Sequence, residues 1–271
     1  MHSELAAYVD AWRHSARNLL ELGRHVSAEE VSRPTDLPGW TVHDVFAHLA
    51  ALEAALAGEP DPPGDPLPSP DLRAVPPAYT ARGVEARRGL PTSEVVEEFA
   101  RHVETRSVEL ATDPPEDPSG TPPGTPGGLD WDWRTLLRNR AIDVWTHEQD
   151  IRRALGRPGN LDGPGARVTV GSFASALPYV LGKRVKPAPG TTMVWDIVGP
   201  VAFTAAIRVG DDGRAVALPE APDRVDAILQ TDTETFAMLG AGRRRPAELS
   251  VEIAGDTDLA ARILSTMTLT S

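Results

Sequence analysis

Four stretches with helical periodicity dominate the N-terminal half of the chain, and proline-rich segments separate them. Apolar residues recur at spacings of three and four over residues 3–23, 41–56, 92–111 and 134–155, which is typical of helices with one buried face. Such helices must pack against one another to cover their apolar sides, and four of similar length favour an antiparallel bundle. The sequence therefore predicts a four-helix bundle over residues 1–160.

Local signals mark the ends of the predicted helices. Thr41 can cap the second helix, with Asp44 in the reciprocal position three residues later. Gly156 is placed to end the fourth helix, because glycine adopts the left-handed conformation of a C-terminal cap at little cost. Residues 58–77 and 113–130 are too rich in proline for regular structure, and we expect them to form surface loops.

The pattern changes after residue 160, where runs of β character appear between shorter helical stretches. The predicted elements are a helix over 165–181, strands over 191–198 and 201–209, a turn over 210–213 into a strand over 214–218, a helix around Phe236, a strand over 249–253 and a helix over 258–267. This mixture indicates an α+β fold. We therefore expect a bundle over 1–160 and a second, α+β domain over 161–271.

The composition limits the classes of function. The chain of 271 residues has a formal net charge of −12 and no cysteine. A strongly acidic protein has little attraction for phosphate backbones, so we expect no nucleic-acid partner, whereas a small anionic ligand is compatible with a local positive field. We find no signal-peptide pattern and no apolar run long enough to span a membrane, so we expect no membrane association. Together with the absence of disulfides, these features predict a cytoplasmic protein.

Three potential metal ligands lie on the apolar sides of two predicted helices. His48 falls in the apolar stripe of the second helix, and Asp143 and His147 lie one turn apart on the inner face of the fourth. A polar side chain on such a face is costly unless something binds it. Two imidazoles and a carboxylate that leave one coordination position open are typical of catalytic zinc. The pattern therefore predicts a divalent metal site, with zinc as the expected ion.

Simpler interpretations apply to each residue taken alone. An Asp-x-x-x-His pair on a helix is usually a surface hydrogen-bonding pair, and a lone buried histidine is usually part of a core. Trp40 and Trp145 either line a cavity or belong to the core. Glu148 and Asp150 are expected to pair with neighbouring arginines, and Asp150 could also orient His147. The remaining histidines have no second ligand at a suitable spacing: His2, His14, His25, His43 and His102.

Two segments of the chain form recognisable motifs, and the C-terminal part adds a weaker one. Residues 37–42 read Leu-Pro-Gly-Trp-Thr-Val and are followed by Ala-His-Leu at 47–49, and residues 143–152 read Asp-Val-Trp-Thr-His-Glu-Gln-Asp-Ile-Arg. These motifs resemble the opening signature and the fourth-helix motif of the mycothiol-dependent maleylpyruvate isomerase family, within the broader DinB-like metalloenzymes. Residues 231–243 and 251–256 are similar to the C-terminal domain of that family, which has a sterol-carrier-like fold.

The resemblance implies roles for individual residues. The two histidine ligands of the family fall on His48 and His147, and its carboxylate ligand falls on Asp143, where the isomerase itself has glutamate. The shorter side chain would draw the metal toward the fourth helix. This departure from the family pattern bears on which reaction is catalysed more than on whether a metal binds. A basic residue of the C-terminal domain assists the isomerase, and Arg243 is its match here. The neighbouring basic residues are more simply explained as solvated loop charge.

The resemblance implies a zinc-dependent enzyme with mycothiol as cosubstrate and a small electrophile as substrate. Since the chain has no cysteine, the sulfur must come from an external thiol, which a metal favours as the nucleophilic thiolate. If the thiolate adds to a double bond, the resulting single bond rotates and the thiolate is expelled, the result is cis–trans isomerisation. If the sulfur stays on the substrate, the enzyme is an S-transferase. Two alternatives stay open: a metal-dependent hydrolase that activates water, and a non-enzymatic protein that binds a small molecule.

Overall fold

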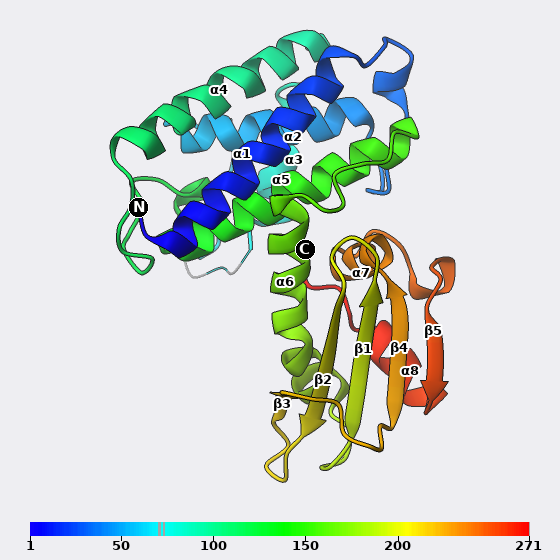
Figure 1. The fold of residues 1–271 in the computed structure, drawn as a ribbon. Helices are drawn as coiled ribbons and strands as arrows, with labels where there is room; N and C mark the ends of the chain where they lie inside the picture. Colours follow the sequence, from blue (N-terminus) through cyan, green and yellow to red (C-terminus); the bar gives the residue numbers. More distant parts are fainter. Residues whose placement is uncertain (70–71, 73, 271) are drawn as a thin grey trace. The chain divides into compact units, whose positions relative to one another are not determined.

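The computed structural model describes residues 1–69, 72 and 74–270. The chain divides into two compact units, residues 1–168 and residues 169–271. Figure 1 shows helices in the first unit and a five-stranded sheet in the second, so the predicted α+β class with an N-terminal helical part is confirmed. The predicted domain boundary after residue 160 lies just before α6 (Pro164–Tyr179), whereas the two units divide within that helix.

Four long helices provide the core of the first unit. They are α1 (Ser3–Arg24), α2 (Val42–Leu56), α4 (Thr92–Thr112) and α5 (Trp133–Leu155), and they match the predicted ranges closely. α1 packs against α4 and α5, and α2 packs against α4 and α5. Their apolar faces meet in one core that includes Trp12, Phe46, Phe99 and Leu137. Short 3-10 helices lie at Glu30–Ser32 and Pro126–Gly128.

The predicted caps fix the ends of the two helices that carry the potential ligands. The Thr41 hydroxyl accepts a hydrogen bond from the backbone N–H of Asp44 (3.3 Å), and the Asp44 carboxylate accepts one from the backbone N–H of Thr41 (2.9 Å). At the other helix, Gly156 ends α5 in the left-handed conformation as predicted, and Asp132, which was not predicted as a cap, accepts a hydrogen bond from the backbone N–H of Thr135 at the N-terminus. These contacts satisfy backbone groups that a helix end leaves without partners.

A short helix was not predicted. α3 (Pro77–Glu85) follows the proline-rich segment and packs against α2. With nine residues it is too short to show a clear apolar period, and it begins with a proline, which fits the first turn of a helix. The loop predicted over 58–77 is irregular where the structure describes it, and residues 70, 71 and 73 of that prediction lie outside the described residues.

The second unit is built on a sheet with the strand order β3-β2-β1-β4-β5. Its strands are β1 (Thr192–Val198), β2 (Phe203–Val209), β3 (Ala215–Leu218), β4 (Ala227–Asp232) and β5 (Glu252–Gly255). β1 and β4 pair in parallel, and the other neighbours are antiparallel. β4 was not predicted from the sequence, and the strand predicted over 249–253 starts three residues before β5. A 3-10 helix occupies Pro246–Glu248, and the backbone N–H of Leu249 still bonds to the carbonyl of Pro246. Pairing with β4 therefore begins only at Glu252, opposite Gln230.

Helices cover the apolar side chains of this sheet. α6 continues into a wider π-type turn at Val180–Val185, and α7 (Thr233–Gly240) and α8 (Thr257–Leu264) pack against β4. Trp195 and Phe236 are fully buried, and their rings meet edge to face at 5.5 Å. In the part of the chain that the structure describes, none of the helices combines the length and the apolar character needed to cross a lipid bilayer.

Candidate metal centre

The structure brings the three predicted ligand residues together inside the helical unit. His48 comes from α2, and Asp143 and His147 come from successive turns of α5. One ligand atom from each residue lies within 4.8 Å of the others. The four-residue spacing on α5 explains why Asp143 and His147 share a face, and the packing of α2 against α5 adds His48.

The distances within this group fit a metal better than they fit hydrogen bonds. The Nε2 atoms of His48 and His147 each lie 3.4 Å from the carboxylate of Asp143. A good N–H···O bond is about 2.7–3.2 Å long. In a tetrahedral zinc site with bonds of about 2.1 Å, two ligand atoms lie about 3.4 Å apart. Both imidazoles therefore lie at a distance from the Asp143 carboxylate that suits a tetrahedral metal, and the three ligand atoms all lie within 4.8 Å of one another.

The group is open to solvent on one side. The side chains of His48 and His147 are 5% and 7% exposed, whereas that of Asp143 is 30% exposed. A small molecule can therefore approach beside Asp143, while both imidazoles are held within the helical core. A site with three ligands and an accessible side is the arrangement of catalytic rather than structural zinc.

Asp150 fixes the orientation of His147. The Nδ1 atom of His147 lies 3.0 Å from the carboxylate of Asp150, and Arg153 donates to the other Asp150 oxygen at 2.6 Å. When the imidazole is neutral and its Nδ1 proton is donated to Asp150, the lone pair of Nε2 is directed toward the group. The orienting role suggested for Asp150 is therefore seen in the structure, and so is its pairing with Arg153.

A buried chain of charges supports Asp143. Arg140, one turn earlier on α5, donates to the Asp143 carboxylate at 2.7 Å and to Glu53 at 2.8 Å. Glu53 is completely buried and also accepts hydrogen bonds from Arg106 (2.6 Å) and from the Trp12 indole (2.8 Å). Sequence reasoning missed Glu53 and Arg140. The available signal was a carboxylate within the apolar stripe of the second helix.

The local charges set the protonation of the group. Burial opposes ionisation of Asp143, yet His147, His48 and Arg140 hold the pKa of its carboxyl well below the usual range. Burial lowers the pKa of His48. Burial acts in the same direction on His147, but Asp143 and Asp150 outweigh it and raise the pKa of that imidazole. A metal that binds this group would therefore compete with a proton more strongly at His147 than at His48.

Trp40 covers the two imidazoles. Its ring centroid lies 5.3 Å from that of His48 and 6.2 Å from that of His147, where the rings are stacked. The Nδ1 atom of His48 is buried and has no hydrogen-bond partner among the described residues. Trp145, in contrast, is a core residue whose indole donates to the carbonyl of Asn160. Trp40 is therefore the tryptophan that lines the site.

The remaining predicted positions lie elsewhere. His43 lies beside the Thr92 hydroxyl (2.8 Å) and the Arg87 carbonyl (3.2 Å), so it faces away from the group as expected. Glu148 pairs with Arg152 at 2.7 Å. Arg243 belongs to the second unit, follows α7, and donates from its side chain to the carbonyl of Ala241.

The fold and this site define a two-unit α+β protein whose helical unit carries a buried His/Asp/His group. A family model described as the mycothiol maleylpyruvate isomerase N-terminal domain matches residues 12–152, just over half of the chain, and the chain belongs to this family. This membership confirms the prediction of an enzyme and sets aside the non-enzymatic alternative.

Two solved structures share the fold. One is the crystal structure of a mycothiol-dependent maleylpyruvate isomerase, and the other is a variant of it with one histidine replaced by alanine. Each is 16% identical to this chain over 92% of both chains, with TM-scores of 0.57 and 0.58 respectively. A comparison with curated protein sequences finds no match.

Glu53 provides the first test of this arrangement. Replacing it by glutamine leaves the buried Arg106 without a counter-charge and Arg140 with Asp143 alone, and breaking a buried ion pair in this way typically costs about 3–5 kcal/mol. We expect Glu53→Gln to lower the free energy of unfolding by this amount, measured by urea denaturation and far-ultraviolet circular dichroism. The exposed Glu97 on α4 is a matched control, and Glu97→Gln should change the free energy by less than about 0.5 kcal/mol. Equal effects of the two substitutions would contradict the buried network.

Proposed function

We propose that this chain is a mycothiol-dependent enzyme that binds one divalent metal, with zinc as the expected ion, through His48, Asp143 and His147. Its substrate is a small molecule with an electrophilic double bond. The observation that carries the proposal is the 3.4 Å spacing of the two Nε2 atoms from the Asp143 carboxylate. Membership of the family supports the thiol and the isomerase reaction.

The residues of the chain provide a prepared ligand set. When bound, a divalent metal at this site would accept an external thiol and favour its anion at neutral pH. Arg140 keeps Asp143 ionised, so that its carboxylate is available as a ligand. Asp150 holds the Nδ1 proton of His147, and Trp40 shields both imidazoles from water. Asp143 is shorter than the glutamate of the isomerase, but it still reaches both imidazoles.

The proposed reaction regenerates the thiol. The sulfur of the thiolate forms a bond with one carbon of the double bond while the π electrons move to the other carbon. Rotation then occurs about the resulting single bond, the carbon–sulfur bond breaks, and the double bond returns in the trans form. No atom is gained or lost. An S-transferase differs because a proton completes the addition and the carbon–sulfur bond persists. We favour the isomerase because the family is named for it.

We also propose that Arg243 assists turnover as a positive charge for the substrate. The role rests on the resemblance to the isomerase family. The backbone N–H of Arg243 bonds to the carbonyl of Met238 at 2.9 Å, and its side chain bonds to Ala241, so the residue is fixed at the end of α7.

Substitution of Arg243 tests this role separately from metal binding. Arg243→Ala should lower kcat/KM for the isomerisation about tenfold or more, because a charge-assisted hydrogen bond contributes about 1.5–3 kcal/mol, and it should leave the metal content unchanged. The neighbouring Arg244 is exposed, and Arg244→Ala serves as the control. An unchanged kcat/KM in Arg243→Ala would remove Arg243 from the mechanism.

The metal ligands can be tested by elemental analysis of purified variants. His48→Ala and His147→Ala should lose the metal, because each removes one of three protein ligands. His43→Ala should retain it, since His43 bonds to Thr92 and Arg87 instead. Full metal occupancy in the His147→Ala protein would show that the site is wrong.

The thiol can be tested with cobalt in place of zinc. A thiolate bound to Co²⁺ gives an intense charge-transfer band in the near ultraviolet, and with no cysteine in the chain the protein itself cannot produce it. Mycothiol should make the band appear in the wild-type protein and not in His48→Ala. The pKa of the bound thiol should lie well below the ~8.5 of a free cysteine thiol. If saturating mycothiol produces no band, the thiol mechanism fails and the metal-dependent hydrolase becomes the better interpretation.

A further inference from the structure

We infer that Arg140 is a positioning residue that occupies one oxygen of the Asp143 carboxylate, so that a metal at the candidate centre binds Asp143 through the other oxygen alone. The inference rests on the proposed metal site, and it explains how that site keeps a coordination position open for an external ligand. Arg140 lies one turn before Asp143 on α5 and was not identified from the sequence.

The two oxygens of Asp143 have different neighbours. Oδ1 lies 3.4 Å from the Nε2 atoms of both His48 and His147, a spacing that suits ligands of one tetrahedral ion. Oδ2 lies equally near His48, but it accepts a hydrogen bond from Nη1 of Arg140 at 2.7 Å. Because donor and acceptor are both charged, this bond is stronger than a neutral one. Oδ1 therefore faces both imidazoles, whereas Oδ2 is held by the guanidinium.

A second carboxylate fixes the guanidinium of Arg140. Its Nε and Nη2 atoms donate to Oε1 of Glu53 at 3.2 and 2.8 Å, and the side chain is only 3% exposed. Glu53 is itself held by the Trp12 indole and by Arg106. Since the planar guanidinium is bonded on two edges, it does not follow Asp143 when that side chain rotates. The Nη1 donor therefore stays at the place where it meets Oδ2.

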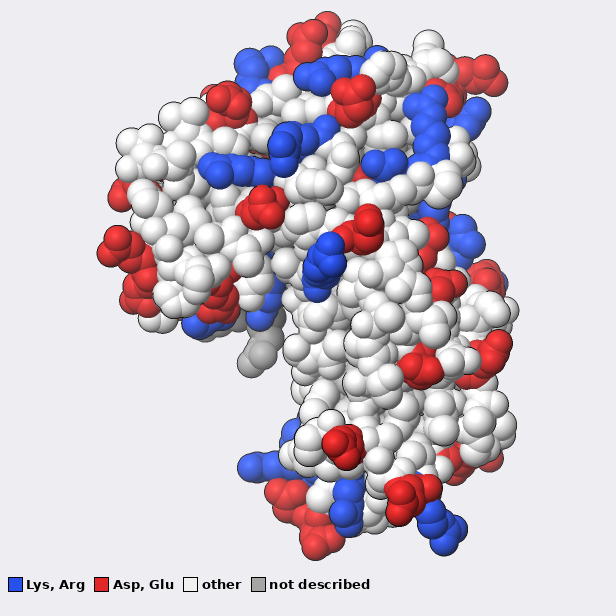
Figure 2. Space-filling model, viewed as in Figure 1, with Lys and Arg blue, Asp and Glu red and all other residues white. Residues whose placement is uncertain are grey.

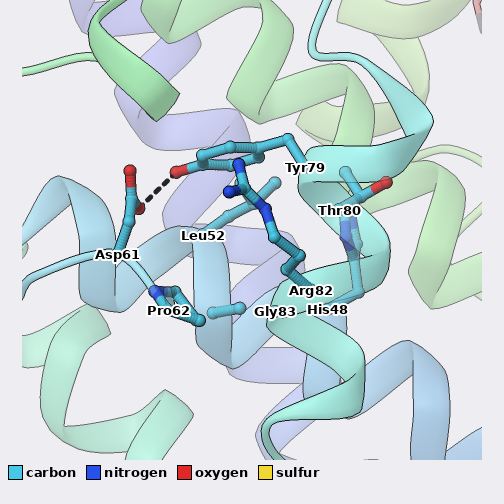
Figure 3. A pocket seen from close by; sticks show the side chains of 9 residues that line it. His48, Leu52, Asp61, Pro62, Tyr79, Thr80, Arg82 and Gly83 are labelled. Carbon is cyan, nitrogen blue, oxygen red and sulfur yellow. Dashed lines mark hydrogen bonds between the residues drawn. The ribbon is translucent and has the colours of Figure 1, made fainter. Parts of the chain in front are cut away.

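The arginines of α3 do not take part in this contact. Figure 3 shows the hollow on the α3 side of His48, which Arg82 also lines. α3 approaches α2 closely there, because a Cβ atom on Gly83 would lie 2.6 Å from a Cβ atom of α2. Arg82 nevertheless donates to a backbone carbonyl of the proline-rich loop at 2.8 Å. In the part of the chain that the structure describes, the guanidinium that contacts Asp143 is that of Arg140.

Burial strengthens the effect of the Arg140 charge. On the face shown in Figure 2, acidic and basic side chains are interspersed over the surface of the helical unit, and exposed pairs of this kind contribute little because water screens them. Arg140 and Glu53 are buried, and charges in such surroundings interact more strongly than in water. A metal ion at Oδ2 would meet the guanidinium across a single oxygen atom. The repulsion between the two cations therefore favours Oδ1.

Binding through one oxygen determines what the site can do. Two imidazoles and one carboxylate oxygen provide three donor atoms, and tetrahedral coordination then leaves one position for an external ligand. A carboxylate that binds through both oxygens would provide a fourth donor atom from the protein, which is the closed arrangement of a structural site. Arg140 therefore keeps the site open without being a ligand itself.

The test replaces each of the two arginines of Glu53 in turn and measures the visible spectrum of bound Co²⁺ without thiol. Arg140→Met removes the donor to Asp143, whereas Arg106→Met removes the other arginine and leaves that donor in place. Each variant leaves Glu53 with one arginine, so both should lose stability to urea to a similar extent. In Arg140→Met the second oxygen is free to bind, and the absorption per bound ion should fall about twofold or more as the number of donors rises. Arg106→Met should keep the wild-type spectrum.

Two results would overturn the inference. One is a wild-type spectrum in Arg140→Met, and the other is an equal change in Arg106→Met, which would assign the change to the damaged network rather than to Oδ2. A crystal structure of the zinc-loaded wild-type protein provides a second measurement that needs no variant. The metal should lie about 2.0–2.2 Å from Oδ1, with Oδ2 still bonded to Arg140 and beyond bonding distance of the metal. Equal distances from the metal to the two oxygens would contradict the inference.

The spectrum also separates this inference from the thiol mechanism. It is recorded without mycothiol, so a missing sulfur band would remove the thiol mechanism and leave the role of Arg140 in place. Cobalt bound with the same spectrum in the wild type and in Arg140→Met would leave the metal site in place and remove only the role of Arg140. If the wild-type protein takes up no cobalt, the metal site is wrong and this inference is wrong with it.

Discussion

One buried carboxylate connects the four long helices of the N-terminal unit. Glu53 on α2 accepts hydrogen bonds from Trp12 on α1, Arg106 on α4 and Arg140 on α5. Its side chain is fully buried, and the ionised form depends on these partners because burial alone would raise its pKa; the two arginines lower it. Removing one member of such a network leaves another charge buried without a partner. The helices are therefore held in a relative arrangement that apolar packing alone does not specify.

The same network reaches the candidate metal centre. Arg140 contacts both Glu53 and Asp143, so the position of the acidic ligand follows from the core of the unit. On the other side of the group, Asp150 and Arg153 hold His147, and Arg153 also bonds to Asp36 in the segment before Trp40. Side chains supported in this way are held in a fixed geometry.

The short helix α3, which packs against α2 beside the candidate metal centre, is held differently. The ligand-bearing helices are long and capped, whereas Arg82 lies on the nine-residue α3 and is held by a loop of prolines and glycines. Binding residues often lie on such connecting segments, because a loop can change without disturbing the core that holds it.

The sequence by itself determined the long helices, the α+β class and the three candidate ligands. Apolar periodicity and caps are local properties, and a spacing of four places Asp143 and His147 on one face of any helix. Tertiary structure decided the rest. Glu53 and Arg140 are 87 positions apart, β4 is defined by its parallel pairing with β1, and α3 depends on the close approach that Gly83 permits. These features arise from contacts between distant segments, which the local pattern of a sequence does not contain.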